Sequence, residues 1–235
     1  HIAACDGIKS KCRSLIYKDA EQPVYSGYSV WRGILEENQS ENHIHLGPNF
    51  HIVTYPINNT RTSFVAAIKN PKKTEESWKS KGTYEDLCRD LPESTRYIYE
   101  SLQDSNEIYK WGVYTKKIPD KLFDNNITFL GDAAHPMVPF LGQGGCMALE
   151  DAYIFGKLIK LNDSMKTSQI MYQKLRYKRV KKIYKDSALQ GKLNHISNPF
   201  IAYCRNFLMK YMLVEALKPN SIWGYDPDVE IKKIR

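Results

Sequence analysis

The sequence predicts an α/β (α+β) fold with an antiparallel sheet in the first half of the chain and helices at its C-terminal end. Apolar and polar residues alternate across residues 25–68, which is typical of half-buried strands. The apolar stretch "ITFLG" at 127–131 indicates a buried strand that leads into a glycine-rich turn. Helical spacing of apolar residues follows this turn, so we expect the sheet to precede a helical region.

These periodicities also predict the individual elements. Strands are expected at 28–35 ("YSVWRGIL"), 50–57 ("FHIVTYPI"), 61–68 ("RTSFVAAI") and 109–118 ("YKWGVYTKKI"). Residues 2–5 are interpreted as the end of a buried strand, which an Asp-Gly turn and a short basic helix follow. One apolar helix face is predicted to consist of Cys146, Leu149, Ala152, Phe155 and Ile159. Further helices are expected at 83–91, 166–190 and 199–217.

Composition narrows the class of protein. With 235 residues, of which 42% are hydrophobic, the chain can bury a sizeable core. Its apolar stretches are shorter than the roughly 20 residues that span a bilayer, so no membrane span is predicted. Five cysteines without a Cys-x-x-Cys pair favour neither a disulfide framework nor a metal site. We therefore expect a cytoplasmic protein without a metal.

The net charge of +8 arises in the C-terminal part, where residues 156–235 contain 17 Lys+Arg and 6 Asp+Glu. Such a basic stretch could bind nucleic acid or anionic lipid. Its apolar residues recur at helical intervals, however, and this favours a solvated helix face. Nucleic-acid binding is the weaker interpretation.

The stretch "GDAAHPMVPFLGQGGCMALEDA" at 131–152 is the best candidate for a site. Gly131 ends the predicted strand, and Asp132 places a carboxylate at its C-terminal edge, where open α/β sheets bind ligands. Gly142, Gly144 and Gly145 leave the start of a helix without side chains, so its N–H groups and positive dipole end can face an electron-rich ligand. The alternative is a glycine-rich helix start that binds nothing.

This stretch, as "ITFLGDAAHPMVPFLGQGGCMALEDA", resembles the second FAD-binding signature of the flavoprotein aromatic hydroxylases, the group of the salicylate and para-hydroxybenzoate hydroxylases. "CDGIKSKCR" at 5–13 resembles the Asp-Gly signature of the same family, and "YSGYSVWRGIL" and "HIVTYPI" resemble its sheet. The resemblance extends from about residue 2 to about 220. It implies a Rossmann-like FAD-binding domain that an antiparallel substrate domain interrupts, with C-terminal helices after it.

The resemblance also implies roles and boundaries. Asp132 would bind the ribitol or ribose hydroxyls of FAD and Gly131 would let FAD lie close, while the ring would be lined by Pro139, Leu141, Gly142, Gln143, Gly144 and Gly145. Asp6 and Gly7 would lie near the pyrophosphate and help NAD(P)H engage, with Arg13 as a supporting cation. The implied segments are 1–24 and 118–165 for the FAD domain, 25–117 for the substrate sheet and 166–235 for the helices.

The reaction implied is that of a monooxygenase. NAD(P)H reduces the flavin, molecular oxygen forms a flavin hydroperoxide, and an oxygen atom hydroxylates or epoxidises an aromatic or conjugated small molecule. The family's N-terminal Gly-x-Gly-x-x-Gly segment has no counterpart in this sequence. We therefore expect the C-terminal portion of such an enzyme, as a fragment, a truncated product or a subunit with an N-terminal partner chain. The alternative is a non-catalytic remnant.

Several other residues have two interpretations. Trp31 and Arg32 could border a carboxylated ring, or they are one buried and one exposed position of a strand. His51 and Tyr55 fall on one strand face and either line the substrate or pack. His135 is interpreted as a histidine fixed in a turn rather than a proton-transfer group.

Overall fold

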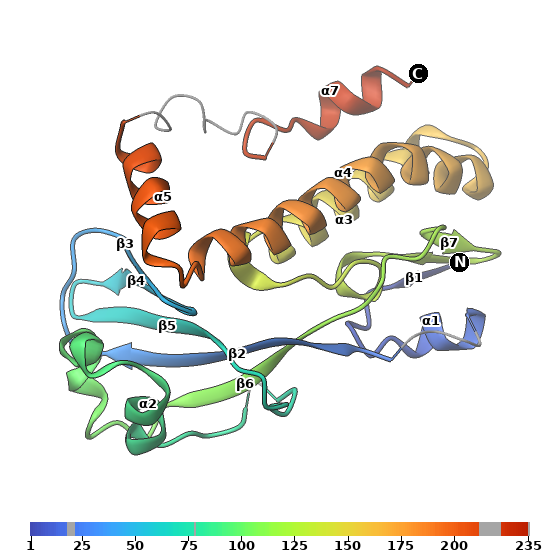
Figure 1. Cartoon of the computed structure of the whole chain (residues 1–235). Coiled ribbons are helices and arrows are strands. Elements are labelled where there is room, and N and C mark those ends of the chain that lie inside the picture. Colours follow the sequence, from blue (N-terminus) through green and yellow to red (C-terminus); the bar gives the residue numbers. More distant parts are fainter. Residues whose placement is uncertain (18–21, 78, 212–221, 235) are drawn as a thin grey trace. The chain divides into compact units, whose positions relative to one another are not determined.

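The computed structural model describes residues 1–17, 22–77, 79–211 and 222–234. The strands are β1 Ile2–Ala4, β2 Val24–Leu35, β3 His43–Gly47, β4 Phe50–Asn58, β5 Arg61–Lys69, β6 Tyr109–Thr115, β7 Phe123–Asp124 and β8 Ile127–Phe129. The α-helices are α1 Lys11–Ile16, α2 Tyr84–Asp90, α3 Gly144–Leu161, α4 Met165–Asn194, α5 Pro199–Tyr211 and α7 Pro227–Lys232. The 3₁₀ turns are η1 Glu93–Ile98, η2 Glu100–Leu102, η3 Gly131–Ala133 and η4 Pro139–Leu141 (Figure 1).

The chain divides into two compact units. Unit 1 contains His1–Val24, Tyr114–Gly191 and Leu208–Arg235, and unit 2 contains Tyr25–Val113 and Lys192–Phe207. The residues expected to form a C-terminal helical region, 166–235, are thus divided between the two units rather than forming a unit of their own.

Unit 2 is built on a five-stranded sheet of order β3-β4-β5-β2-β6 (Figure 1). The predicted strands at 28–35, 50–57 and 61–68 are confirmed, and β2–β5 and β4–β5 pair antiparallel in continuous register up to an irregularity after Pro56. Because side chains alternate along a strand, one face of this sheet carries Trp31, Leu35, Ile52 and Phe64, which are all completely buried. Residues of α2, η1 and η2 complete this core.

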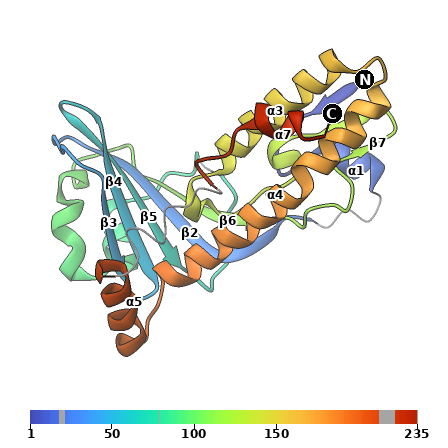
Figure 2. The ribbon, with the colours of Figure 1, turned by 90° about the horizontal axis from the view of Figure 1, so that it is seen from above.

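Unit 1 contains a three-stranded sheet of order β1-β8-β7. The predicted strand at 127–131 is confirmed as β8, which pairs in parallel with β1 through Ala4 and Phe129. Two helices, α3 and α4, run side by side in this unit (Figures 1 and 2) and contribute Ile154, Phe155 and Ile183 to its core. The helix predicted at 166–190 is α4, and the helix predicted at 199–217 begins as α5, with residues 212–217 outside the described part.

The predicted apolar face of α3 is wrong in most of its members. Leu149 is 73% exposed and Cys146 and Ile159 are exposed too, so only Phe155 of that set is in the core. The buried side of α3 instead carries Met147, Asp151, Ile154, Phe155 and Leu158. Helical spacing predicted the wrong side because Asp151 counts as polar in the pattern, whereas in the fold its carboxylate is fully satisfied inside the protein.

None of the helices in the described ranges is both long and apolar enough to cross a membrane.

Candidate functional site

The glycine-rich stretch forms a loop between β8 and α3. β8 ends at Phe129, the chain turns through η3 and η4, and α3 begins at Gly144. Gly131 has φ +55°, and a Cβ there would lie 3.1 Å from the Cβ of Ala148 on α3. A larger residue at Gly131 would therefore be strained twice, by its left-handed backbone and by the helix that packs against it.

A pocket of about 600 Å³ opens at this loop, entirely within unit 1. Asp132 is exposed and lines it, so a carboxylate acceptor stands directly after the strand. The complete lining is Cys5, Gly7, Leu130, Gly131, Asp132, Met137, Val138, Pro139, Gly142, Gly144, Gly145, Ala148 and Ala152. Its size lies in the range of small-molecule and cofactor sites.

The N-terminal end of α3 carries no side chains on the side that faces the pocket. A Cβ added at Gly142, Gly144 or Gly145 would meet no atom within 4 Å, so these glycines border open space. Gln143 at the N-cap provides no side-chain hydrogen bond, and no acidic residue occupies the first turn. The positive end of the helix dipole thus has no carboxylate of its own helix to offset it, which favours an electron-rich ligand.

Behind the loop, Asp151 on α3 forms the centre of a buried polar network. Its Oδ2 accepts hydrogen bonds from the backbone N–H of Gly131 at 2.8 Å and from His135 Nε2 at 2.6 Å. Its Oδ1 accepts from Arg176 Nε of α4 at 2.7 Å. The Asp151, His135 and Arg176 side chains are at most 1% exposed. One carboxylate therefore holds the residue before Asp132, the turn after it and the neighbouring helix in a fixed relation.

The electrostatics of this network keep Asp151 ionised. Burial works to raise its pKa, but the hydrogen bond and charge of His135, the charge of Arg176 and the Gly131 N–H outweigh burial, and the pKa lies below its ordinary value. Arg176 also donates to Glu150 Oε2 at 2.5 Å and to the carbonyl oxygen of Met147 at 3.2 Å. The interpretation of His135 as a histidine fixed by hydrogen bonding agrees with this geometry.

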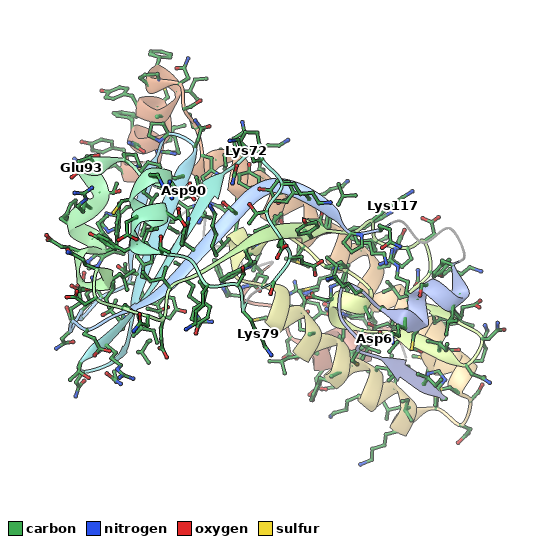
Figure 3. The ribbon with its side chains drawn as sticks, turned by 90° about the horizontal axis from the view of Figure 1, so that it is seen from below. Asp6, Lys72, Lys79, Asp90, Glu93 and Lys117 are labelled. Carbon is green, nitrogen blue, oxygen red and sulfur yellow. The ribbon has the colours of Figure 1, made fainter. Side chains whose placement is uncertain are left out.

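The Asp-Gly segment forms a second wall of the pocket. Gly7, with φ +75°, and Cys5 line it. Asp6, labelled in Figure 3, accepts from the backbone N–H of Cys12 at 3.1 Å, so its carboxylate is bound to the first turn of α1. Arg13 is 5% exposed and donates to the carbonyl oxygens of Ala133 and Ala134 at 3.4 Å each, and to that of Lys117.

The structure therefore brings most of the predicted cofactor residues together. Gly7, Gly131, Asp132, Pro139, Gly142, Gly144 and Gly145 line one pocket. The lining does not include Asp6, Arg13, Leu141 or Gln143. Arg13 instead connects the Asp-Gly segment to the glycine-rich loop, because its guanidinium donates to backbone carbonyls of that loop. Sequence reasoning missed Cys5, Met137 and the role of Arg176. The charge pattern of "YQKLRYKRV" carried no signal that separates Arg176 from its exposed neighbours.

In unit 2, Trp31 and Arg32 have separate surroundings. Trp31 is completely buried on the core face, and its Nε1 donates to Oδ2 of Asp90, which is labelled in Figure 3, at 2.8 Å. Arg32 is exposed on the opposite face and lines a pocket of about 590 Å³ together with Lys79 and Trp111. The two residues are thus one buried and one exposed position of β2, and Trp31 does not border that pocket.

His51 and Tyr55 share the face of Arg32, since Arg32 pairs with Val65 and Val65 with Val53 of β4. Tyr55 is 39% exposed, whereas His51 is 6% exposed and its Nδ1 lies 2.7 Å from Nε2 of His195. Burial and mutual repulsion lower the pKa of His51 to about 3. Burial chiefly lowers the pKa of His195 to about 4. Both imidazoles are therefore neutral near pH 7, with one N–H between them.

The donor set of the glycine-rich pocket fits FAD. An exposed carboxylate suits sugar-like hydroxyls, and glycine backbone at a helix N-terminus suits a flat, electron-accepting ring. In the described ranges, no group of three or more His, Cys, Asp or Glu side chains is arranged to hold a metal ion.

Comparison with known proteins identifies the family. Residues 1–183 match the family described as "FAD binding domain". The chain belongs to this FAD-binding domain family. The residues that build the glycine-rich pocket, from Cys5 to Ala152, lie inside the matched range.

Individual relatives agree with this assignment. The chain is 28% identical over 204 residues to 3-amino-4-hydroxybenzoate 2-monooxygenase PtnB3 of Streptomyces platensis, which covers 83% of this chain and 51% of the relative. Its fold is similar to that of Klebsiella pneumoniae HpxO complexed with FAD and uric acid (TM-score 0.78, 20% identity, 97% of this chain and 59% of that one). It is also similar to a salicylate hydroxylase substrate complex (TM-score 0.79, 22% identity, 98% and 62%).

The chain thus spans about half the length of the curated relative and about 60% of the two solved structures. The mixed helix-and-sheet fold with an antiparallel sheet is the fold of these FAD-dependent hydroxylases. FAD is accordingly the cofactor of this domain, and the glycine-rich pocket lies within the matched residues.

Proposed function

We propose that this protein acts as part of an FAD-dependent monooxygenase that uses NAD(P)H and molecular oxygen to hydroxylate or epoxidise an aromatic or similarly conjugated small molecule. The observation that carries the proposal is the glycine-rich pocket, in which an exposed Asp132 and the uncapped N-terminus of α3 line one 600 Å³ space. A relative that is named for oxidation of an aminohydroxybenzoate supports the aromatic substrate class.

FAD, when bound, supplies the redox chemistry with oxygen. The residues of this chain bind and orient it. The carboxylate of Asp132 would accept hydrogen bonds from the sugar-type hydroxyls of FAD, and the helix N-terminus at Gly144 and Gly145 would stabilise negative charge on the bound cofactor. Asp151 holds the loop that presents Asp132, because it binds the N–H of Gly131 from behind.

The substrate side of the proposal rests on the sheet of unit 2. Arg32 is an exposed cation that lines the same pocket as Trp111, and a cation and an aromatic ring in one pocket suit a carboxylated ring. His51 and Tyr55 are carried on the same sheet face as Arg32. We propose these three as substrate-side residues, and an N-terminal partner segment as the supplier of the remaining FAD contacts.

Flavin retention by the purified protein tests the proposal. Protein with bound FAD absorbs near the flavin maximum, and addition of NADH or NADPH in air should lead to oxidation of the nucleotide, faster with a hydroxybenzoate present. Absence of flavin binding, both alone and with the N-terminal part of a relative added, would refute the proposed cofactor role for this chain.

The variant Asp132→Ala sharpens this test. Loss of one charge-assisted hydrogen-bond acceptor is expected to weaken FAD binding by about 10-fold or more. Asp163→Ala is the matched control, since Asp163 is an exposed aspartate outside the pocket. Equal FAD affinity of Asp132→Ala and Asp163→Ala in a titration followed by flavin fluorescence would contradict the role of Asp132.

A further inference from the structure

A second pocket of unit 1 is lined mainly by cations. It has a volume of about 400 Å³ and lies between the segment after β6 and the middle of α4. Lys116 and Lys117 line one side, and Lys181 and Lys185 of α4 line the other. Asp120 is the only carboxylate among the described lining residues. Within this part of the chain, four positive charges thus surround a space with a single negative charge.

Lys116 distinguishes this pocket from an ordinary basic helix face. Its side chain is 5% exposed, and among the described residues it has no ion-pair or hydrogen-bond partner. Burial, followed by the positive charge of Arg13, lowers the pKa of Lys116, while Asp6 partly offsets this. A lysine side chain that is largely buried among other cations is costly for the folded state. Such a group is expected where an anion completes the site.

The surrounding side chains allow an anion to enter. Lys117, labelled in Figure 3, and Lys185 are exposed, and no described carboxylate pairs with either. The Nζ of Lys181 lies 4.4 Å from the centre of the Tyr177 ring, and no described carboxylate pairs with it. Tyr184 adds a half-buried aromatic side chain to the wall. Lysine ammonium groups are point charges that bind phosphate oxygens from several directions.

The pocket is also connected to the FAD loop. Arg13 donates to the carbonyl oxygen of Lys117 and, with its other terminal nitrogen, to those of Ala133 and Ala134. Ala133 directly follows Asp132. The two pockets share no lining residue, so an anion bound among these lysines would occupy a site distinct from the glycine-rich pocket.

We propose that the pocket of Lys116, Lys117, Lys181 and Lys185 binds a phosphate group, carried by a nicotinamide nucleotide or by free phosphate or pyrophosphate. The nucleotide source rests on the proposed function, whereas phosphate binding as such does not. The four lysines neutralise the phosphate, Lys116 gains an ion-pair partner, and Tyr184 supplies a surface against which an attached organic group packs.

Calorimetric titration with inorganic pyrophosphate at low ionic strength tests the proposal directly. The protein should bind it, and Lys116→Met and Lys185→Gln should each weaken binding by about 10-fold or more. Lys160→Gln is the matched control, because Lys160 is an exposed lysine of α3 outside the pocket. No binding by the wild type would overturn the proposal. An equal loss in Lys160→Gln would also overturn it, because such a loss indicates general charge attraction.

Thermal unfolding gives a second readout that a merely structural lysine would not produce. Without ligand, Lys116→Met should raise the Tm by about 2–4 °C, since it replaces a largely buried cation that lies near other cations with an apolar side chain. With pyrophosphate, the wild type should gain stability and Lys116→Met should not. A lower Tm of Lys116→Met combined with unchanged binding by Lys185→Gln would overturn the proposal.

Competition identifies the source of the phosphate. Displacement of pyrophosphate by NADPH and NADH alike indicates the nucleotide's pyrophosphate, and displacement by NADPH alone indicates its 2′-phosphate. Displacement by neither assigns the site to free phosphate or pyrophosphate, which supports the phosphate site without the nucleotide. Stronger binding of benzoate than of pyrophosphate would contradict phosphate as the ligand class. FAD binding, measured in parallel by absorbance, reports separately on the proposed function.

Discussion

Arg176→Met is expected to destabilise unit 1 strongly. In the wild type the guanidinium of Arg176 is completely buried and donates to Asp151 at 2.7 Å, to Glu150 at 2.5 Å and to the carbonyl oxygen of Met147 at 3.2 Å. Methionine preserves most of the volume but leaves the Asp151 carboxylate buried with only Gly131 and His135 as partners. Removal of one partner of a buried ion pair costs about 3–5 kcal/mol.

Urea unfolding at pH 7 measures this loss. Lys182→Met is the control on the same helix, since it removes an equal charge from an exposed pair with Asp186 at 2.6 Å. That pair is worth about 0.3–0.5 kcal/mol. FAD affinity should fall in Arg176→Met as well, because Asp151 holds the loop of Asp132. A free energy of unfolding for Arg176→Met within about 0.5 kcal/mol of that for Lys182→Met would refute the reasoning.

Two further predictions concern the histidine pair and the loop glycine. The pKa values of His51 and His195 are lowered to about 3 and about 4 in the folded state. The unfolded chain therefore binds more protons than the folded chain below pH 6.5. The free energy of unfolding should fall from pH 6.5 towards pH 4 by up to about 1.4 kcal/mol per pH unit for each histidine. Chemical denaturation across this range checks it, and an identical slope in His195→Gln would contradict it. Gly131→Ala should cost about 1 kcal/mol or more and weaken FAD binding, because of φ +55° and the contact with Ala148. Gly156→Ala, in open space within α3, should instead be neutral or stabilising in the same thermal melts.

Local pattern was sufficient for most of the sheet and for part of the site. The alternation in "FHIVTYPI" specifies a two-faced strand, and in the structure β4 pairs as that pattern requires. Gly142, Gly144 and Gly145 border open space at the start of a helix. The sequence predicts this space because glycine has no Cβ that could fill it. Such features depend on neighbours in the sequence, and a single sequence contains that information.

The buried side of α3 could not be read in this way. Asp151 is inside because Arg176, His135 and Gly131, which are 16 to 25 residues away, together satisfy its carboxylate. Hydrophobic periodicity cannot predict a buried charge whose hydrogen-bond partners belong to another helix and to a loop. The same limit applies to His51, whose partner His195 is 144 residues away.

By itself the sequence determined the strand pattern, the glycine-rich loop with Asp132, and the resemblance that leads to FAD. The tertiary structure decided which side chains are paired. It separated Arg176 from the exposed cations of the same helix, buried Trp31 while leaving Arg32 on the opposite face, and left Lys116 largely buried without a described ion-pair partner. The physical reason is that the free energy of a buried polar group depends on its hydrogen-bond and ion-pair partners. These partners are often far away in the sequence and come together only when the chain is folded.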